Sequence, residues 1–298
     1  MKRRFHTLDV FTNQPLAGNP LAVVLDSDGL DDKSMQAIAA EFNLSETVFV
    51  MPPETDGGTA RIRIFTPVHE LPFAGHPTVG TAILLSQLNH LEDGAELVLE
   101  ENVGPVTCKV SDGDNGRTVR FGLPKVSTPI DHAFDAEGWA KSLGLSKDIM
   151  ESSRGGLWNG GVPYTMVPVT SMDAVASVAI DMTSLREVEP MFDGIAANPY
   201  VFCRGGEAPD TDFHARMFAP LFGISEDPAT GSAVASMSGW IAEHEMGNNE
   251  KRAFKIEQGY EMGRPSQIYL DIEKRDGEVV NAGISGAAVR IAEGTLDI

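Results

Sequence analysis

The chain contains the same short motif twice, and this internal repeat limits its fold more than any other feature. In the first copy, F-T-P at 65–67 precedes H-P-T-V-G-T-A at 76–82; in the second, F-A-P at 218–220 precedes D-P-A-T-G-S-A at 227–233. Pro, Gly and Ala recur in the same order, and the intervening loop differs slightly in length. A duplicated unit usually places its functional site where the copies meet. The repeat therefore predicts two similar halves that share one site.

Both copies have the composition of a loop that leads into a helix. A Pro is tolerated at a helix start because its missing N–H would have no partner there. A helix start presents unpaired N–H groups and about half a positive charge, so it can hold a carboxylate or a developing oxyanion. The alternative is that these Gly and Pro residues only punctuate ordinary helices. The duplication favours a site.

The remaining patterns indicate an α+β fold. Asp31 or Asp32 can cap an amphipathic helix that ends near Asn43, and further helices are predicted at 77–88 and 230–243. Short apolar or alternating segments typical of strands outnumber these helices and do not alternate with them regularly. That arrangement argues against a doubly wound sheet.

Length and charge limit the domain count and the partners. A chain of 298 residues that is 42% hydrophobic suggests two domains, with a boundary in the loop-like stretch at 124–133. The 23 Lys and Arg residues against 43 Asp and Glu residues give a net charge of -20, so nucleic acid is a poor partner. A small anionic substrate remains compatible, because nearby amides and side chains set the potential of a pocket.

The sequence predicts a cytoplasmic protein that makes no contact with membranes. The N-terminal M-K-R-R-F-H-T-L-D-V-F has no apolar segment behind its basic residues, and no run of ~18 apolar residues occurs. Cys108 and Cys203 are far apart and outside any C-x-x-C pattern, so neither a metal site nor a disulfide is expected.

Three residues are candidates for chemistry. His76 and Asp227 take equivalent places in the two motifs, although an Asp there can be a helix N-cap and a lone His is usually a surface or packing residue. Glu46, in N-L-S-E-T, precedes an apolar strand, where desolvation would raise its pKa and let it carry protons near neutrality. Taken alone, a Glu there is more often a surface residue. The Gly-rich loop predicted at 155–161 lacks the Walker Lys and the G-x-G-x-x-G pattern.

Four motifs in order resemble the PhzF family of phenazine-biosynthesis-like proteins. They are D-V-F-T-N-Q-P-L-A-G-N-P-L-A-V-V from Asp9, N-L-S-E-T from Asn43, L-P-F-A-G-H-P-T from Leu71 and D-P-A-T-G-S-A from Asp227. The likeness extends to the closing G-A-A-V-R-I-A-E-G-T-L.

The resemblance implies a diaminopimelate-epimerase-like fold. This is an α+β fold of two pseudo-symmetric domains, each a curved, mostly antiparallel sheet around a central helix, with the ligand between them. The last strand of this fold commonly returns to the first domain. We therefore expect a first domain of 1–120 plus 286–298 and a second of 121–285.

The resemblance also implies an isomerase that needs no cofactor and acts on a small, carboxylated substrate. In the phenazine enzyme a Glu that matches Glu46 moves a proton between two carbons, and residues that match His76 and Asp227 assist. The positions that match substrate contacts are Asn19, Gly75, Gly231 and Ser232. A homodimer is implied as well.

The chain lacks a residue that thiol-dependent members of the wider fold use, and this limits the reactions that it can catalyse. Epimerase and proline-racemase relatives use two opposed thiols, but Ala74 stands where the first thiol is expected, and both cysteines lie outside the helix-start motifs. Two-thiol racemisation is therefore disfavoured. A member of the family that only binds a metabolite or protein, and a racemase or epimerase that works without thiols, remain alternatives, and the sequence does not identify the substrate.

Overall fold

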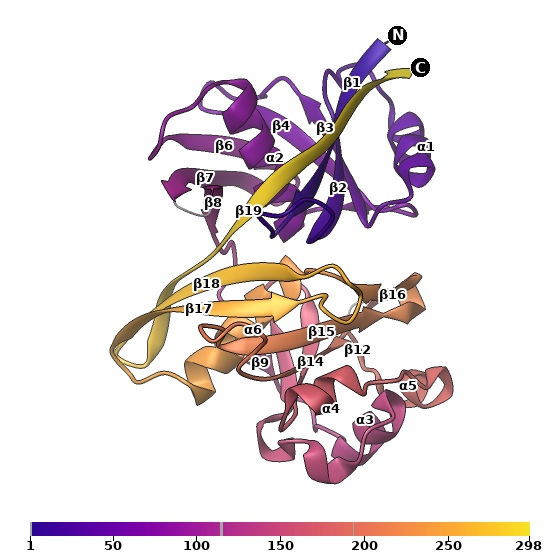
Figure 1. Ribbon diagram of the computed structural model, residues 1–298, viewed down its shortest axis with the longest axis vertical. Coiled ribbons are helices and arrows are strands. Elements are labelled where there is room, and N and C mark those ends of the chain that lie inside the picture. The colour runs from indigo at the N-terminus through magenta and orange to yellow at the C-terminus, as the bar shows by residue number, and fades with distance from the viewer. Residues whose placement is uncertain (1, 114–115, 193) are drawn as a thin grey trace. The chain divides into compact units, whose positions relative to one another are not determined.

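The chain forms two compact units: Met1–Gly122 with Ser285–Ile298, which is unit 1, and Leu123–Ile284, which is unit 2. A computed structural model describes residues 2–113, 116–192 and 194–298. Each unit is a mixed α/β structure in which strands predominate (Figure 1). Within the described ranges, no helix has the length and apolar character needed to cross a membrane.

Unit 1 consists of a sheet and two helices. The strands are β1 (Lys2–Val10), β2 (Asn19–Val24), β3 (Glu46–Met51), β4 (Ala60–Phe65), β5 (Glu70–Leu71), β6 (Glu96–Glu101), β7 (Gly104–Gly113), β8 (Gly116–Gly122) and the part of β19 (Glu278–Asp297) from Ser285 onward, and the helices are α1 (Asp32–Phe42) and α2 (Gly75–Leu88). Most pairings are antiparallel, but β2 with β3 and β4 with β6 are parallel. The C-terminal part of β19 runs antiparallel to β1, from Val10 opposite Ala288 to Lys2 opposite Asp297 (Figure 1).

Helix α2 is the centre of unit 1. It contacts β1, β2, β3, β6, β7 and β8, and every residue from its start to Ser86 is buried. A helix that is buried on all sides must be apolar or small all round, and G-H-P-T-V-G-T-A-I-L-L-S meets that requirement. The helix begins at Gly75, two residues before the start predicted from sequence, so His76 lies inside its first turn.

Helix α1 matches its sequence prediction. Asp31 is the N-cap and accepts a hydrogen bond from the backbone N–H of Ser34 at 2.8 Å. Asn43 ends the helix with a left-handed backbone, which Asn tolerates better than most residues (φ 51°). The buried face packs on β3 and β4.

Unit 2 has more elements than the sequence suggests. The strands are β9 (Thr128–Ile130), β10 (Gly156–Asn159), β11 (Pro163–Pro168), β12 (Met191–Phe192), β13 (Ile195–Ala196), β14 (Asn198–Arg204), β15 (Phe213–Ala219), β16 (Ile224–Asp227), β17 (Glu250–Gln258) and β18 (Ser266–Arg275), and the helices are α3 (Ala136–Leu143), α4 (Met172–Ala176), α5 (Met182–Val188) and α6 (Gly231–His244). The prediction of a continuous loop at 155–161 is wrong, because 156–159 pairs with both β9 and β11. A four-residue segment that begins with Gly gives little strand signal of its own, so its neighbours decide its conformation.

Helix α6 is the buried core helix of unit 2, and it confirms the helix predicted near 230–243. Trp240 is fully buried among aromatic rings, with its centroid 4.8 Å from Phe202 and 6.1 Å from Phe213. Its indole N–H donates to the carbonyl of Arg154 at 2.7 Å. A second cluster of buried apolar side chains lies under α3, α4 and α5 and includes Trp139 and Leu185.

Gly239 is required where α6 approaches the strands of unit 2. A Cβ at this position would lie 2.8 Å from the carbonyl oxygen of Ser127 and 2.7 Å from the ring of Trp158. We expect Gly239→Ala to lower the free energy of unfolding by about 1–3 kcal/mol, because the overlap outweighs the better helix propensity of Ala. Urea unfolding measures the change. Gly57→Ala, whose Cβ would meet no atom within 4 Å, is the control, and equal stability of both variants would contradict the prediction.

Candidate functional site

The structure brings Glu46 and His76 together in unit 1. Glu46 is the first residue of β3 and His76 is the second residue of α2. Oε2 of Glu46 lies 3.3 Å from Nε2 of His76, and the two side chains are only 14% and 5% exposed. Glu46 is therefore not a surface residue at a strand end. It is a largely buried carboxyl group against an imidazole.

Asn19 completes the cluster from a third element. It is the first residue of β2, and its side-chain Nδ2 lies 3.5 Å from Nδ1 of His76, at the outer limit of a hydrogen bond. Strands β2 and β3 are parallel neighbours, with Leu21 opposite Glu46, so both polar residues lie at the same end of the sheet. The sequence predicted all three residues of this cluster but not their mutual contacts.

Burial makes His76 a neutral group. Loss of solvent lowers the pKa of His76 to about 3, and a hydrogen bond with the carbonyl of Pro20 opposes this only in part. A neutral imidazole has one N–H donor and one acceptor nitrogen. The contact with Glu46 is therefore a close approach of a carboxyl oxygen to a neutral ring, rather than an ion pair.

The neutral state of His76 is testable by NMR. We expect its ring ¹⁵N signals to keep the pattern of a neutral imidazole from pH 5 to pH 7 in the folded protein. In urea the same residue should titrate near its ordinary pKa of about 6.5. Protonation of folded His76 within that range would show that Glu46 stabilises an imidazolium, contrary to this prediction.

In unit 2, Asp227 supports the turn before α6. It is the last residue of β16, is buried, and its Oδ2 accepts a hydrogen bond from the hydroxyl of Thr230 at 2.5 Å. Thr230 is the N-cap residue of α6. Gln258 braces the same turn by donating to the carbonyl of Asp227 at 2.7 Å and to the Thr230 hydroxyl at 2.9 Å.

The predicted equivalence of His76 and Asp227 is wrong. Helices α2 and α6 each have 14 residues and begin at Gly75 and Gly231. By position in its helix, the counterpart of His76 is therefore Ser232, whereas Asp227 lies four residues before α6 begins. The motifs align by their Pro, Gly and Ala letters, but those letters fall at different positions relative to the two helix starts.

Ser232 has a partner that the sequence analysis missed. Its Oγ lies 2.8 Å from the hydroxyl of Tyr164 on β11. A lone Tyr in a strand carries no functional signal in one sequence, so only the fold identifies this contact. Among the predicted residues of unit 2, Asp227, Gly231 and Ser232 thus lie within one turn and helix start.

Neither cysteine is suited to proton transfer. Both thiols are buried and free, and burial raises the pKa of Cys203 to about 11 and that of Cys108 further still. A thiol must ionise to act as a base near neutrality. The geometry therefore agrees with the prediction that two-thiol racemisation is disfavoured.

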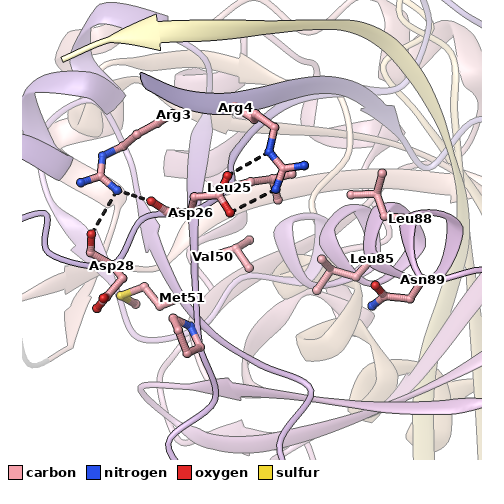
Figure 2. Close-up of a pocket in the computed structure, with 11 residues that line it drawn as sticks. Arg3, Arg4, Leu25, Asp26, Asp28, Val50, Met51, Leu85, Leu88 and Asn89 are labelled. Carbon is pink, nitrogen blue, oxygen red and sulfur yellow. Dashed lines mark hydrogen bonds and ion pairs between the residues drawn. The ribbon is translucent and has the colours of Figure 1, made fainter. Parts of the chain in front are cut away.

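A hollow of about 660 Å³ opens elsewhere on unit 1 (Figure 2). Val50 and Met51 line it, and both lie at the end of β3 opposite to Glu46. A strand rises about 3.3 Å per residue, so the hollow is on the order of 15 Å away from Glu46.

The charged groups of this hollow bind one another. Figure 2 shows Arg3 donating to the backbone carbonyls of Asp26 and Asp28, and Arg4 donating to the carboxylate of Asp26 at 2.9 and 3.1 Å. These contacts hold the two guanidinium groups against the loop that follows β2. The Glu46 cluster is the better candidate site.

Comparisons with known proteins identify the family of the chain and relatives that are named isomerases. The family model described as phenazine biosynthesis-like protein, PhzC-PhzF, matches residues 8–294. An uncharacterised isomerase of Mesorhizobium japonicum is 45% identical over 99% of both chains, and the trans-2,3-dihydro-3-hydroxyanthranilate isomerase of Pseudomonas fluorescens is 36% identical over 97% of both. The crystal structure of a PhzF-family phenazine biosynthesis protein of Bacillus anthracis covers 100% of both chains, with 27% identity and a TM-score of 0.89.

Proposed function

The chain belongs to the phenazine biosynthesis-like (PhzC-PhzF) family and is an isomerase, and we propose that it moves a proton between two carbons of a small, carboxylated substrate. Glu46 is the general acid/base of this reaction, and no cofactor takes part. The observation that carries the proposal is the buried 3.3 Å contact between Glu46 and His76 at the start of α2.

A single carboxyl group is sufficient for this chemistry. As a carboxylate it accepts a proton from one carbon, and as a carboxylic acid it returns that proton to another. Low exposure favours such transfers, because desolvation weakens the preference of a carboxyl group for its ionised form.

His76 suits both protonation states of Glu46. With the proton on Nε2, a modest shortening of the 3.3 Å approach would let the ring donate to the Glu46 carboxylate, while Nδ1 accepts from the side-chain amide of Asn19. With the proton on Nδ1, Nε2 is the acceptor nitrogen of the ring and can accept from protonated Glu46. The neutral imidazole can therefore orient the Glu46 carboxyl group and relay its proton, and it does not hold that proton permanently.

The first turn of α2 supplies electrostatic stabilisation for the proposed reaction. The backbone N–H groups of Gly75 and His76 belong to the opening turn, where a helix has no internal acceptors for them. Such groups stabilise a substrate carboxylate or the negative charge that develops when a carbon loses its proton. Substrate contacts by Asn19, Gly231 and Ser232, assistance by Asp227, and a homodimeric assembly stay predictions.

A deuterium-exchange screen tests the proposal. The protein is incubated in D₂O with a panel of cyclic and amino-acid carboxylates that includes trans-2,3-dihydro-3-hydroxyanthranilate, the substrate in the name of the Pseudomonas fluorescens relative. We expect carbon-bound deuterium in at least one compound together with a moved double bond, read by NMR and mass spectrometry.

Two other outcomes would contradict the proposal. Binding of a compound, seen as a raised Tm, without any deuterium incorporation would indicate a member of the family that does not catalyse. Loss of optical rotation with no change of connectivity would indicate a racemase or epimerase that works without thiols.

A further inference from the structure

A second buried carboxyl group, Glu101, lies against the helix that carries His76. Glu101 is the last residue of β6 and is only 5% exposed. Its Oε1 lies 2.7 Å from the hydroxyl of Thr78, the fourth residue of α2, and its Oε2 has no hydrogen-bond partner among the described residues. The proposed reaction assigns no role to this group.

The number of hydrogen atoms available at the Thr78 hydroxyl determines whether Glu101 carries a proton. The Thr78 hydroxyl is also 2.8 Å from the carbonyl oxygen of Ala74, the residue that precedes α2. A hydroxyl has one hydrogen, and a carbonyl and a carboxylate are both acceptors only. Both short contacts are satisfied when Glu101 is a carboxylic acid that donates to Thr78, while Thr78 donates to Ala74.

The surroundings of Glu101 agree with a neutral acid. Burial raises the pKa of Glu101 to about 8, and neither the hydrogen bond from Thr78 nor the charge of Arg61 on β4 reverses this. Arg61 is engaged elsewhere, since Nη1 donates to the carbonyls of Ile62 and Glu100 at 2.7 Å. Cys108 on β7 is a titratable neighbour of Glu101, and its thiol stays protonated because burial raises its pKa.

Unit 2 contains a neutral residue in the corresponding place. Gln258 is the last residue of β17, and its amide donates to the hydroxyl of Thr230 at the start of α6, as the Glu101 acid would donate to Thr78. A Gln side chain has nearly the shape of a protonated Glu and cannot ionise. Thr78 lies inside α2 and Thr230 precedes α6, so the two threonines are not equivalent, but in each unit the side chain that ends the strand contacts a threonine hydroxyl near the helix start.

The preceding residue in each strand strengthens the comparison. Glu100 accepts hydrogen bonds from the backbone N–H groups of Glu54 and Thr55 in unit 1. Glu257 accepts them from the backbone N–H groups of Glu207 and Ala208 in unit 2. The pairs Glu100-Glu101 and Glu257-Gln258 thus end β6 and β17 with the same pattern: the first side chain holds a loop, and the second contacts a threonine at a helix start.

We propose that Glu101 is a positioning residue whose proton fixes the first turn of α2 and so holds His76 against Glu46. A contribution of Glu101 to catalysis rests on the proposed function, but the effect of its proton on the first turn of α2 does not. When Glu101 loses its proton, the donor to Thr78 disappears, and the Thr78 hydroxyl must leave either Ala74 or the new carboxylate. The position of His76 then depends on a group that does not touch the substrate.

NMR of His76 tests the proposal without a substrate. In ¹⁵N-histidine-labelled protein we expect the His76 ring signals, identified by their loss in His76→Gln, to move with a midpoint near pH 8. His76 itself is neutral throughout this range, so the movement reports Glu101. In Glu101→Gln the signals should stay fixed between pH 7 and pH 9.5. Thr78→Val removes the connection, so its His76 signals should not follow pH even though Glu101 still titrates.

Infrared spectroscopy of the wild-type protein provides a second test that does not depend on the folding of any variant. The wild type should show the carbonyl band of a buried carboxylic acid that disappears with a midpoint near pH 8. Absence of such a band at pH 6.5, or a pH response of His76 in Glu101→Gln equal to that of the wild type, would overturn the proposal.

Activity separates this proposal from the proposed function. If a substrate is found, turnover of the wild type should fall above pH 8, whereas turnover of Glu101→Gln should stay level. If Glu101 had a purely structural role, Glu101→Gln would change the rate but would still lose turnover above pH 8. Exchange that survives in Glu46→Gln would refute the proposed function and leave the NMR result standing.

Discussion

Glu46→Gln should abolish turnover, with a loss of at least about 10²–10⁴-fold in the rate of deuterium incorporation. The amide has nearly the shape of the carboxyl group, so it can occupy the same place, 3.3 Å from Nε2 of His76 in the wild type. It cannot accept a proton from carbon and release it again. The substitution therefore removes the chemistry and leaves the packing around His76 in place.

The controls for this variant address folding and charge separately. Urea unfolding should give Glu46→Gln a stability close to that of the wild type, because the side chain is retained in size. Glu41→Gln makes the same change on an exposed position of α1 and should leave exchange unaffected. If Glu46→Gln exchanges deuterium at a rate near that of the wild type, Glu46 is not the acid/base.

The family and the unit 1 cluster were accessible from sequence, and the match of the family model over 8–294 confirms the resemblance. Glu46, His76 and Asn19 stand in local motifs that can be read letter by letter. Their contacts could not be predicted, because β2, β3 and α2 approach one another only through the folding of the sheet around the helix. A single sequence specifies residue types at a site more readily than the distances between them.

The errors have a common physical cause. His76 was matched with Asp227 because the two motifs were aligned by amino-acid identity. The position of a residue relative to a helix start depends instead on where the helical backbone begins. Residues 156–159, inside the glycine-rich stretch 155–161, form a strand because the neighbouring strands offer hydrogen-bonding edges. Glu101 and Gln258 carry no motif at all. Polar residues at strand ends look like surface residues until the helix that covers them is known.

Glu257→Ala should destabilise the protein more than any other single change considered for unit 2, by about 3–5 kcal/mol. The carboxylate is fully buried at 0% exposure and accepts hydrogen bonds from the N–H of Glu207 at 2.8 Å, the N–H of Ala208 at 3.2 Å and the hydroxyl of Thr211 at 2.6 Å. Its removal leaves these donors without a partner and opens a cavity beside His214.

His214 makes the effect dependent on pH. Burial alone would lower its pKa, but contacts with Glu257 at 3.6 Å and Glu261 at 2.9 Å outweigh burial and raise the pKa to about 9. Because this value exceeds the ordinary 6.5, the folded protein holds the proton more tightly than the unfolded chain. The stabilisation is complete below pH 6.5 and is lost as the pH rises through 9. Without Glu257, we expect that alkaline loss to become smaller.

Urea unfolding at several pH values between 6 and 9.5 measures both effects together. Wild-type stability should fall across this range, and the difference between wild type and Glu257→Ala should narrow as His214 loses its proton. Glu278→Ala, at an exposed position, is the matched control and should follow the wild type. A destabilisation below about 1 kcal/mol, or a difference that does not change with pH, would mean that water replaces the carboxylate and that His214 is not held charged by Glu257.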